Sequence, residues 1–293
     1  MGRKLVIFLA VLAVISPALA KYSGGTGEPN DPYQIGDVND LLAFACDSND
    51  HDKSVILTAD IDMQNQGFDS PVIASFDGNF DGNNYTIFNT TIREGFFGKN
   101  YGSIKNLRLD NIIVNRYKST SYNNGTGTLA GENSGSIINC HVTSSKLSSS
   151  SIYAGGLVGI SMGRIQNCIE NCSFQGEVFN SYGTAGGLVG KNTHYYYNQK
   201  IQISNCFTNC YVEGSRVAGL VASNYTDIKN CFSICELNAT GSSYIQHAGG
   251  LIATNHNGNI TNSGCYSNIT TESTQVVGGL IGVGSDYSLE NRI

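Results

Sequence analysis

The stretch Gly186-Gly-Leu-Val-Gly190 decides the fold, because close copies of it recur along the chain. The copies are Gly95-Phe-Phe-Gly98, Gly127-Thr-Leu-Ala-Gly131, Gly155-Gly-Leu-Val-Gly159, Ala218-Gly-Leu-Val-Ala222, Gly249-Gly-Leu-Ile-Ala253 and Gly278-Gly-Leu-Ile-Gly282. By subtraction, their central residues lie 28 to 33 positions apart. A fixed period of this length indicates a solenoid, in which each repeat forms one coil of a stack.

A second motif keeps the same rhythm a few residues downstream. Its copies are Ser103-Ile-Lys-Asn-Leu107, Ser136-Ile-Ile-Asn-Cys140, Arg164-Ile-Gln-Asn-Cys168, Gln202-Ile-Ser-Asn-Cys206, Asp227-Ile-Lys-Asn-Cys231 and Asn259-Ile-Thr-Asn-Ser263. Helical solenoids need long runs of 3.6-residue periodicity, whereas these repeats break into short β-rich runs separated by Gly, Asn and Ser. The sequence therefore predicts an all-β chain, folded as a right-handed parallel β-helix.

Stacked coils lie about 4.8 Å apart and place equivalent residues above one another. Three files of structural residues follow from this geometry: inward leucines, corner asparagines that tolerate left-handed backbone, and cysteines. Their expected members are Leu157, Leu188, Leu220, Leu251 and Leu280; Asn139, Asn167, Asn205 and Asn230; and Cys140, Cys168, Cys206 and Cys231. For the nine cysteines, buried free thiols, inter-coil disulfides and a metal site remain open alternatives.

The two motifs carry a family resemblance. Gly-Gly-Leu-Val-Gly followed by Ile-x-Asn-Cys resembles the GLUG motif repeats of bacterial secreted and surface proteins, including regions of some IgA-peptidase-like proteins. The run from Phe76 to Ile87 resembles the entry into such an array, and the resemblance extends over about residues 76 to 291. It implies a β-helix in an extracytoplasmic setting and implies no activity.

The first twenty residues have the features of a secretory signal. A basic start precedes an apolar run from Leu5 to Ile15, and the small-residue pattern at its end predicts cleavage after Ala20. Eleven apolar residues are too few to span a bilayer, so we expect no membrane span after cleavage and a secreted or cell-surface location. The formal net charge of −6 argues against nucleic acid as a partner.

Residues 21–75 are expected to cap the first coil, with residues 76–293 forming the repeats. The run from Asp37 to Cys46 predicts a short helix with an acidic N-cap, and the run from Ser54 to Asp62 predicts a strand. The cap is acidic, but the run from Asp47 to Asp52 lacks the glycine and glutamate of a calcium loop, so solvated charge is favoured over calcium. Because no polar cap follows the last repeat, we expect either a truncated product or an open coil that self-associates.

No catalytic, cofactor-binding or metal-binding residue stands out. Beyond residue 100 the acidic residues are sparse and mostly out of phase, which argues against a polysaccharide lyase or hydrolase, the main enzymatic alternative. The chain is therefore expected to be a structural scaffold or an adhesin-like binder of an extracellular glycan or surface protein. The candidate ligand contacts are Tyr195, Tyr196 and Tyr197, in an insertion between the two motifs of one coil.

Overall fold

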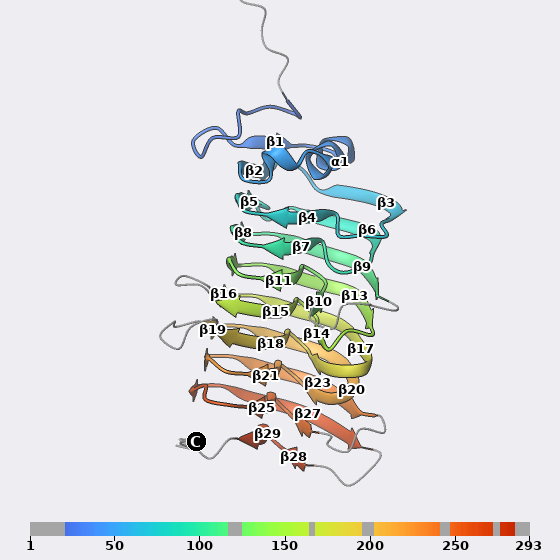
Figure 1. Cartoon of the computed structure of the whole chain (residues 1–293), viewed down its shortest axis with the longest axis vertical. Coiled ribbons are helices and arrows are strands. Elements are labelled where there is room, and N and C mark those ends of the chain that lie inside the picture. The colour runs from blue at the N-terminus through green and yellow to red at the C-terminus, as the bar shows by residue number, and fades with distance from the viewer. Residues whose placement is uncertain are drawn as a thin grey trace, which may run out of the picture.

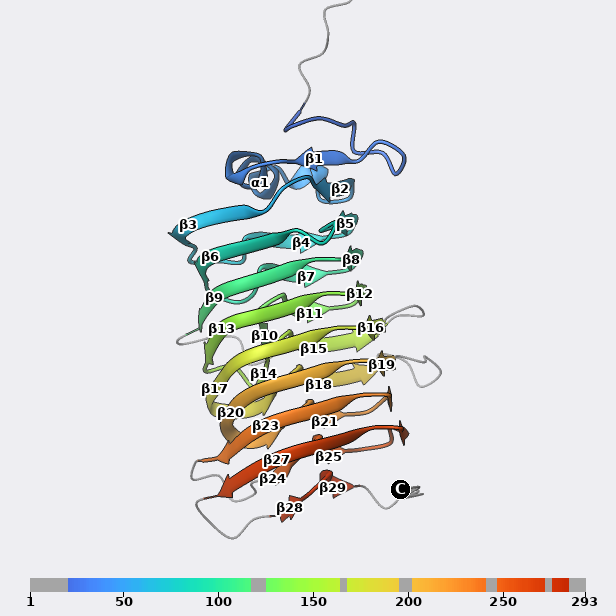
Figure 2. The same ribbon diagram turned by 180° about the vertical axis from the view of Figure 1, so that it is seen from behind.

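The chain forms a stack of coils with three parallel sheets along its sides (Figures 1 and 2). The computed structural model describes residues 21–116, 125–163, 168–194, 202–240, 247–271 and 276–284. The nine-stranded sheet contains β1 (Tyr33–Ile35), β2 (Ser54–Leu57), β5 (Asn79–Asp81), β8 (Ser103–Lys105), β12 (Ser136–Ile138), β16 (Cys168–Glu170), β19 (Gln202–Ser204), β22 (Asp227–Lys229) and β26 (Ile260–Thr261).

The eight-stranded sheet receives one strand from each coil. Its strands are β4 (Ile73–Phe76), β7 (Phe97–Asn100), β11 (Ala130–Asn133), β15 (Val158–Gly163), β18 (Val189–His194), β21 (Val221–Asn224), β25 (Ile252–Asn255) and β29 (Ile281–Gly284). All its neighbouring strands pair in parallel, as the β-helix prediction requires.

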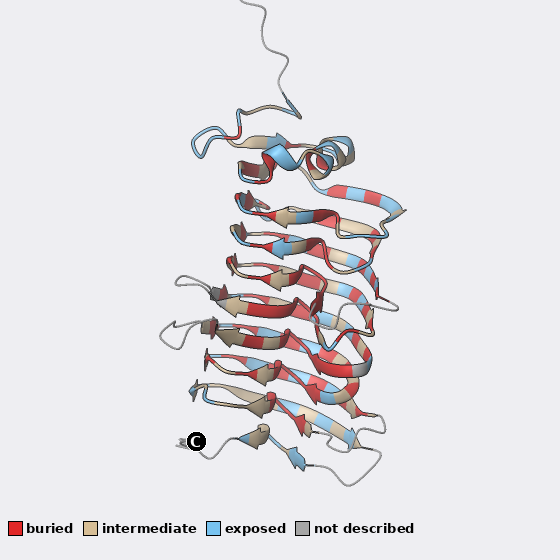
Figure 3. Ribbon diagram, viewed as in Figure 1, coloured by how far each residue is buried: buried red, intermediate tan, exposed pale blue. Residues whose placement is uncertain are grey.

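The third sheet is built from the longest strands. It contains β3 (Ile61–Gly67), β6 (Thr86–Ile92), β9 (Arg108–Arg116), β13 (His141–Ser149), β17 (Ser173–Gly186), β20 (Phe207–Ala218), β23 (Phe232–Ala239) and β27 (Gly264–Thr271), with the short β10 (Gly125–Gly127), β14 (Tyr153–Gly155), β24 (His247–Gly249) and β28 (Val276–Gly278) at its edge. Buried and exposed residues alternate along these strands, so one face lines the interior and the other faces solvent (Figure 3).

The repeated leucines follow one another along the interior. The main-chain nitrogen of Leu157 donates to the carbonyl of Leu188 at 2.9 Å, and the same bond links Leu188 to Leu220 at 2.9 Å. Leu220 donates to Leu251, and Leu251 to Leu280, both at 3.0 Å. The first four side chains are fully buried and Leu280 is partly buried. Each buried leucine contributes about 1.5–3 kcal/mol relative to an exposed one.

The close approach of the next coil requires glycine before four of the repeated leucines, at Gly156, Gly187, Gly219 and Gly250. A Cβ atom on Gly187 would lie 2.1 Å from the carbonyl oxygen of Gly219 and 2.7 Å from the Sγ atom of Cys210. Those carbonyl oxygens accept hydrogen bonds from small interior side chains: Thr208 Oγ1 donates to Gly219 at 2.7 Å, and Ser233 Oγ donates to Gly250 at 2.8 Å. The glycines therefore let adjacent coils pack closely, while the buried carbonyl oxygens at this contact accept hydrogen bonds from interior hydroxyl groups.

Asparagines turn the chain at the corner that follows the nine-stranded sheet. The side-chain amide of Asn139 donates to Asn106 Oδ1 at 2.8 Å, and that of Asn230 donates to Asn205 Oδ1 at 3.1 Å. All four have φ values of 53° to 55°, in the left-handed region that asparagine tolerates. The file begins at Asp81, which accepts from Asn106 Nδ2 at 3.0 Å. Burial pushes the pKa of Asp81 upward, but the bonds from Asn106, the Asn83 main chain and Lys105 outweigh it and hold this pKa below its usual value.

One coil does not have the register that the motif spacing predicts. Ile137 of β12 pairs with Ile169, so the positions equivalent to Asn139 and Cys140 are Asn171 and Cys172. Asn171 donates to Asn139 Oδ1 at 2.9 Å, and the Cys172 Sγ atom accepts from the Cys140 main-chain nitrogen at 3.4 Å.

The assignment of Cys168 to the cysteine file is therefore wrong. Cys168 pairs with Gln202, four residues before Cys206, and Cys172 takes the expected place. Asn167 lies outside the described residues, and Asn171 occupies the corner position.

A helix covers the first coil, as the sequence predicts. Helix α1 (Val38–Cys46) begins after Asp37, whose side chain accepts from the main-chain nitrogens of Asn39 and Asp40, and a short 3₁₀ helix, η1 (Ser48–Asp50), follows it. Phe44 of α1 packs against Phe76 of β4 with ring centroids 6.4 Å apart. Strands β2, β3 and β4 already belong to the three sheets, so regular stacking begins near residue 54 rather than at residue 76.

Candidate functional site

Four large apolar side chains are exposed close together on the outer face of the third sheet, the one built from the longest strands. Phe207 and Phe232 are 40% and 41% exposed, Ile234 is 40% exposed and Tyr266 is 77% exposed. Phe207 pairs with Phe232, and Ile234 pairs with Tyr266, so these four residues lie on β20, β23 and β27 as one patch. We call this patch the apolar row. Exposed groups of large apolar residues commonly mark sites of interaction.

A hollow lies on the same sheet beside the end of β13 and the register shift between β17 and β20. Its volume is about 330 Å³, and its lining residues are Lys146, Ser148, Ser149, Phe179, Asn180, Ser181 and Glu213. The outward positions come from equivalent places on three adjacent strands, since Ser148 of β13 pairs with Phe179 of β17 and Phe179 pairs with Glu213 of β20. The hollow therefore combines hydroxyl, amide, carboxylate and ammonium groups around one aromatic ring.

Charged and aromatic contacts order the wall of the hollow. The Lys146 ammonium lies 4.7 Å from the centroid of the Phe179 ring and 3.0 Å from the Glu177 carboxylate. The rings of Phe179 and Tyr211 lie 5.4 Å apart. The Tyr211 hydroxyl donates to Glu213 Oε2 at 2.7 Å, and burial together with this bond raises the pKa of Tyr211.

Asn180 lines the floor of the hollow with its side chain turned into the interior. Its Nδ2 atom donates to the carbonyl of Thr184 at 3.2 Å, whereas its buried Oδ1 atom has no hydrogen-bond partner in the described part of the chain. The Asn180 side chain is only 2% exposed. A buried amide oxygen without a partner costs about 1–3 kcal/mol, and since this atom is shielded from solvent it offers no acceptor to a molecule in the hollow.

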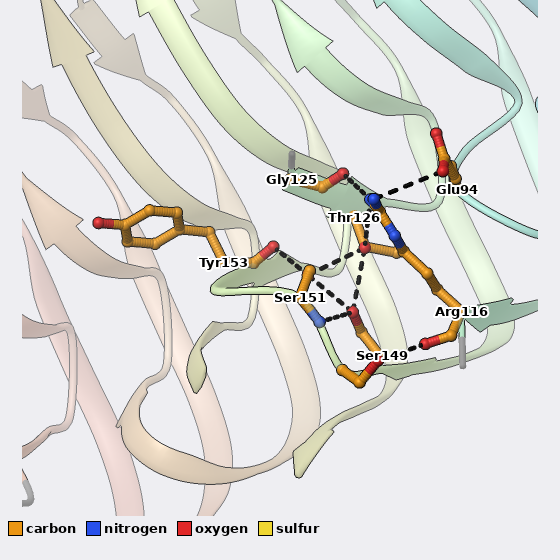
Figure 4. A network of polar contacts seen from close by, with 8 residues as sticks. Glu94, Arg116, Gly125, Thr126, Ser149, Ser151 and Tyr153 are labelled. Carbon is orange, nitrogen blue, oxygen red and sulfur yellow. Dashed lines mark hydrogen bonds and ion pairs between the residues drawn. The ribbon is translucent and has the colours of Figure 1, made fainter. Parts of the chain in front are cut away.

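A polar network supports the bend that follows the neighbouring long strands (Figure 4). The buried Arg116 donates to the carbonyl of Gly125 at 3.0 Å and forms an ion pair with Glu94 at 3.4 Å. Thr126 Oγ1 donates to Ser151 Oγ at 3.0 Å, and Ser151 Oγ donates to the carbonyl of Tyr153 at 2.9 Å. Ser149 joins this network and also lines the hollow, so the network holds part of its floor.

A second group of aromatic residues lies on a different corner. The Lys191 ammonium lies 5.1 Å from the Tyr153 ring and 5.6 Å from the Tyr225 ring. Tyr225 stacks on His256 with centroids 4.0 Å apart, and burial, with Lys191 and Arg216 nearby, lowers the pKa of His256. The expected contacts Tyr195, Tyr196 and Tyr197 follow β18 in the chain and lie outside the described residues.

The acidic cap contains ion pairs. Lys21 lies 2.7 Å from Asp47 and 2.5 Å from Asp50, and Asp50 also accepts a hydrogen bond from the Tyr22 hydroxyl. Within the described ranges, no group of three or more His, Cys, Asp or Glu side chains could hold a metal ion.

The cysteines whose side chains the structure describes are free thiols: Cys46, Cys140, Cys172, Cys206, Cys210, Cys231, Cys235 and Cys265. No helix in the described parts of the chain is long and apolar enough to cross a membrane.

Three comparisons relate the chain to known proteins. No known family model matches it. Over 183 residues, 57% of the chain, it is 30% identical to halomucin of Haloquadratum walsbyi, and this match spans 2% of the length of halomucin. A solved structure described as an IgA1 protease has a TM-score of 0.43, with 13% identity over 76% of this chain and 21% of that one. A TM-score of this size is too low to indicate a common fold.

A crystal structure from Bacteroides ovatus, provisionally described as an immunoglobulin A1 protease, matches more completely. Its TM-score is 0.63, with 19% identity over 90% of this chain and 87% of that one. A likeness at this identity shows a common fold and no common activity. The structure and this comparison together establish that the chain is a parallel β-helix.

Proposed function

We propose that the chain is an exported, non-enzymatic β-helix that binds an extracellular glycan on the outer face of β20 and its neighbours. The observation that carries the proposal is the combination of the apolar row and the hollow on one sheet face. Sugar rings have apolar faces that stack on aromatic side chains, and their hydroxyls bond to amides and carboxylates. This face offers both kinds of group.

The spacing of these groups suits an extended ligand. Glu213 lies six positions after Phe207 along β20, which corresponds to about 20 Å of strand. Both side chains point outward, since the alternate positions Thr208, Cys210 and Val212 are buried. An oligosaccharide of several rings lying along β20 would contact the apolar row at one end and the hollow at the other.

Export is part of the proposal. It is supported by the signal-like features of residues 1–20, which lie outside the described residues, and by the similarity to halomucin, whose name indicates a mucin-like protein. We further propose that the repeats are of the GLUG type, on the two motifs in the sequence. Both inferences favour a secreted or cell-surface location.

The non-enzymatic part rests on how the acidic residues of this face are engaged. Glycoside hydrolases need two carboxyl groups that flank the scissile bond, one of them available as an acid. Here Glu177 is paired with Lys146, and Glu213 accepts hydrogen bonds from Tyr211 and from Asn238 at 3.3 Å. Both acidic side chains are therefore already held by neighbouring groups, an arrangement suited to positioning a ligand. A hydrolase or lyase remains the alternative function, which product release from plant and algal polysaccharides would support.

A glycan array with the full chain tests the proposal. The variants Phe232→Ala and Glu213→Gln alter the apolar row and the hollow, and Tyr101→Ser removes an aromatic side chain that is 42% exposed, away from both, as the matched control. We expect each site variant to weaken binding at least tenfold and the control to bind as the wild type does. Binding that is lost only in the triple variant Tyr195→Ser, Tyr196→Ser, Tyr197→Ser would move the site to that segment. No binding by the wild type would leave a structural scaffold as the function.

A further inference from the structure

Two buried cysteines face one another across adjacent coils. Cys210 of β20 and Cys235 of β23 are register partners, and their Sγ atoms lie 3.0 Å apart. Partners in neighbouring parallel strands have Cα atoms about 4.8 Å apart, within the range of about 4.4–6.8 Å that disulfides need. The sulfur atoms would have to approach by about 1 Å to reach the bond length of about 2.05 Å.

No other thiol is a register partner of these two, although Cys265 of β27 lies close enough to Cys235 to interact with it electrostatically. The residue paired with Cys210 on its other side is Gly176, and the one paired with Cys235 on its other side is Ser267. The column therefore places no third thiol next to either cysteine. If an inter-coil disulfide forms in this column, its partners are Cys210 and Cys235.

The cysteines at the corner have a different role. Cys140, Cys172, Cys206 and Cys231 each donate to the carbonyl oxygen two residues earlier, at 3.4, 3.1, 3.1 and 3.3 Å. In the next coil Ser263 makes the same bond with its hydroxyl, at 2.9 Å. The corner thiols thus serve as hydrogen-bond donors that serine can replace. The corner thiols also interact with one another from coil to coil, and burial together with Cys140 and Cys206 raises the pKa of Cys172. The Sγ atoms of Cys210 and Cys235 lie 3.0 Å apart.

We propose that Cys210 and Cys235 form a disulfide that links the coils of β20 and β23 when the chain folds in an oxidising compartment. Each thiol loses a proton and one electron as the S–S bond forms, and a disulfide oxidant, such as oxidised glutathione or a thiol oxidase, accepts both electrons and becomes two thiols. Both thiols are buried once the coils have stacked, so an oxidant cannot reach them in the folded chain. The exchange therefore takes place during folding.

This inference goes beyond glycan binding and depends only on the oxidising setting, which refolding reproduces. The reduced, denatured full chain is refolded with reduced and oxidised glutathione, alkylated in denaturant without reductant, digested and analysed by mass spectrometry. We expect the peptide of Cys210 linked to that of Cys235, about 2 Da below the sum of the two, with Cys46 alkylated. The same link is expected in protein taken from the periplasm of an exporting host.

Two variants separate this link from other pairings. Cys210→Ser should leave Cys235 alkylated, and Cys172→Ser, which alters the corner file, should leave the link intact. The melting temperature of the wild type should fall by several degrees when reductant is added, and that of the double variant Cys210→Ser, Cys235→Ser should not respond. Cys210 and Cys235 both alkylated in refolded and exported protein, or Cys235 linked to a corner cysteine, would overturn the proposal.

Discussion

A buried file of asparagines runs along the ends of the strands of the eight-stranded sheet, and one residue interrupts it. Asn100 Nδ2 donates to Asn133 Oδ1 at 2.7 Å, and Asn224 Nδ2 donates to Asn255 Oδ1 at 2.9 Å. Between these pairs, Ser161 stands where the register places the next asparagine after Asn133. Its hydroxyl is buried and has no hydrogen-bond partner among the described residues.

Replacing Ser161 with Asn should restore the file. The new Nδ2 atom would donate to Asn192 Oδ1, a buried acceptor that lacks a partner in the described ranges, and the new Oδ1 atom would accept from Asn133 Nδ2. Asn133 already donates to the carbonyl of Gly135 at 3.0 Å, and Asn224 shows that one amide can make both bonds.

The expected gain is a balance of two effects. Satisfying the Asn192 acceptor is worth about 1–3 kcal/mol, and ordering the longer side chain costs about 1 kcal/mol. We therefore expect Ser161→Asn to raise the free energy of unfolding by up to about 2 kcal/mol relative to the control variant Ser161→Ala. For a chain of this size, that corresponds to a rise of up to about 8 °C in melting temperature.

Thermal unfolding followed by circular dichroism measures the change. Ser161→Ala is the control, because it removes the unpaired hydroxyl without supplying an amide, and relieving that buried group should itself raise the melting temperature slightly. The gain should also vanish when Asn192 is replaced by Ala, since the new amide then has no acceptor. Ser161→Asn melting no higher than Ser161→Ala, or a gain that survives in the Asn192→Ala background, would refute the reasoning.

Three further predictions follow from the coil contacts. Gly187→Ala should lower the free energy of unfolding by about 3 kcal/mol or more, because its Cβ would overlap the Gly219 carbonyl, whereas Gly67→Ala, with nothing within 4 Å, should be close to neutral in denaturant titration. Asn224→Ala should cost about 2–4 kcal/mol in the same measurement, because four hydrogen bonds are lost in the interior. The folded-state pKa of Asp81 is lowered, so its carboxylate stabilises the fold above a pH of about 4. This stabilisation is lost as the pH falls through the folded-state pKa. The melting temperatures of wild type and Asp81→Asn should therefore differ at pH 6 and converge near pH 2.

The interior of the coils was predictable because stacking forces the residues of one column to match. Leu157, Leu188 and Leu220 each contact the equivalent residue of the next coil, so their spacing reports the coil length directly. The helix over the first coil was predictable for a local reason, since Asp37 caps it in the way that its position in the sequence indicates.

The register of one coil was not predictable from the motif, because the motif occurs there twice in succession. Ile165-Gln-Asn-Cys168 and Ile169-Glu-Asn-Cys172 both fit the pattern. In the structure β17 begins at Ser173, directly after the second copy, which leaves the additional residues before β16. The next coil carries its own additional residues at the same corner, between β18 and β19. Only the neighbouring coils distinguish the two registers.

The outer face follows a different rule from the interior, and this explains why the candidate site was missed. The inward column Leu147, Val178, Val212 and Leu237 contains aliphatic residues throughout, because each member must pack on the next. The adjacent outward column contains Lys146, Glu177, Tyr211 and Glu236, which differ in charge and size. Stacking does not constrain outward positions in this way, so repetition cannot predict them. Strict alternation along β20 does reveal that Phe207, Tyr211 and Glu213 face outward together, and in a repeat protein such departures from the repeat are where a binding site has freedom to form.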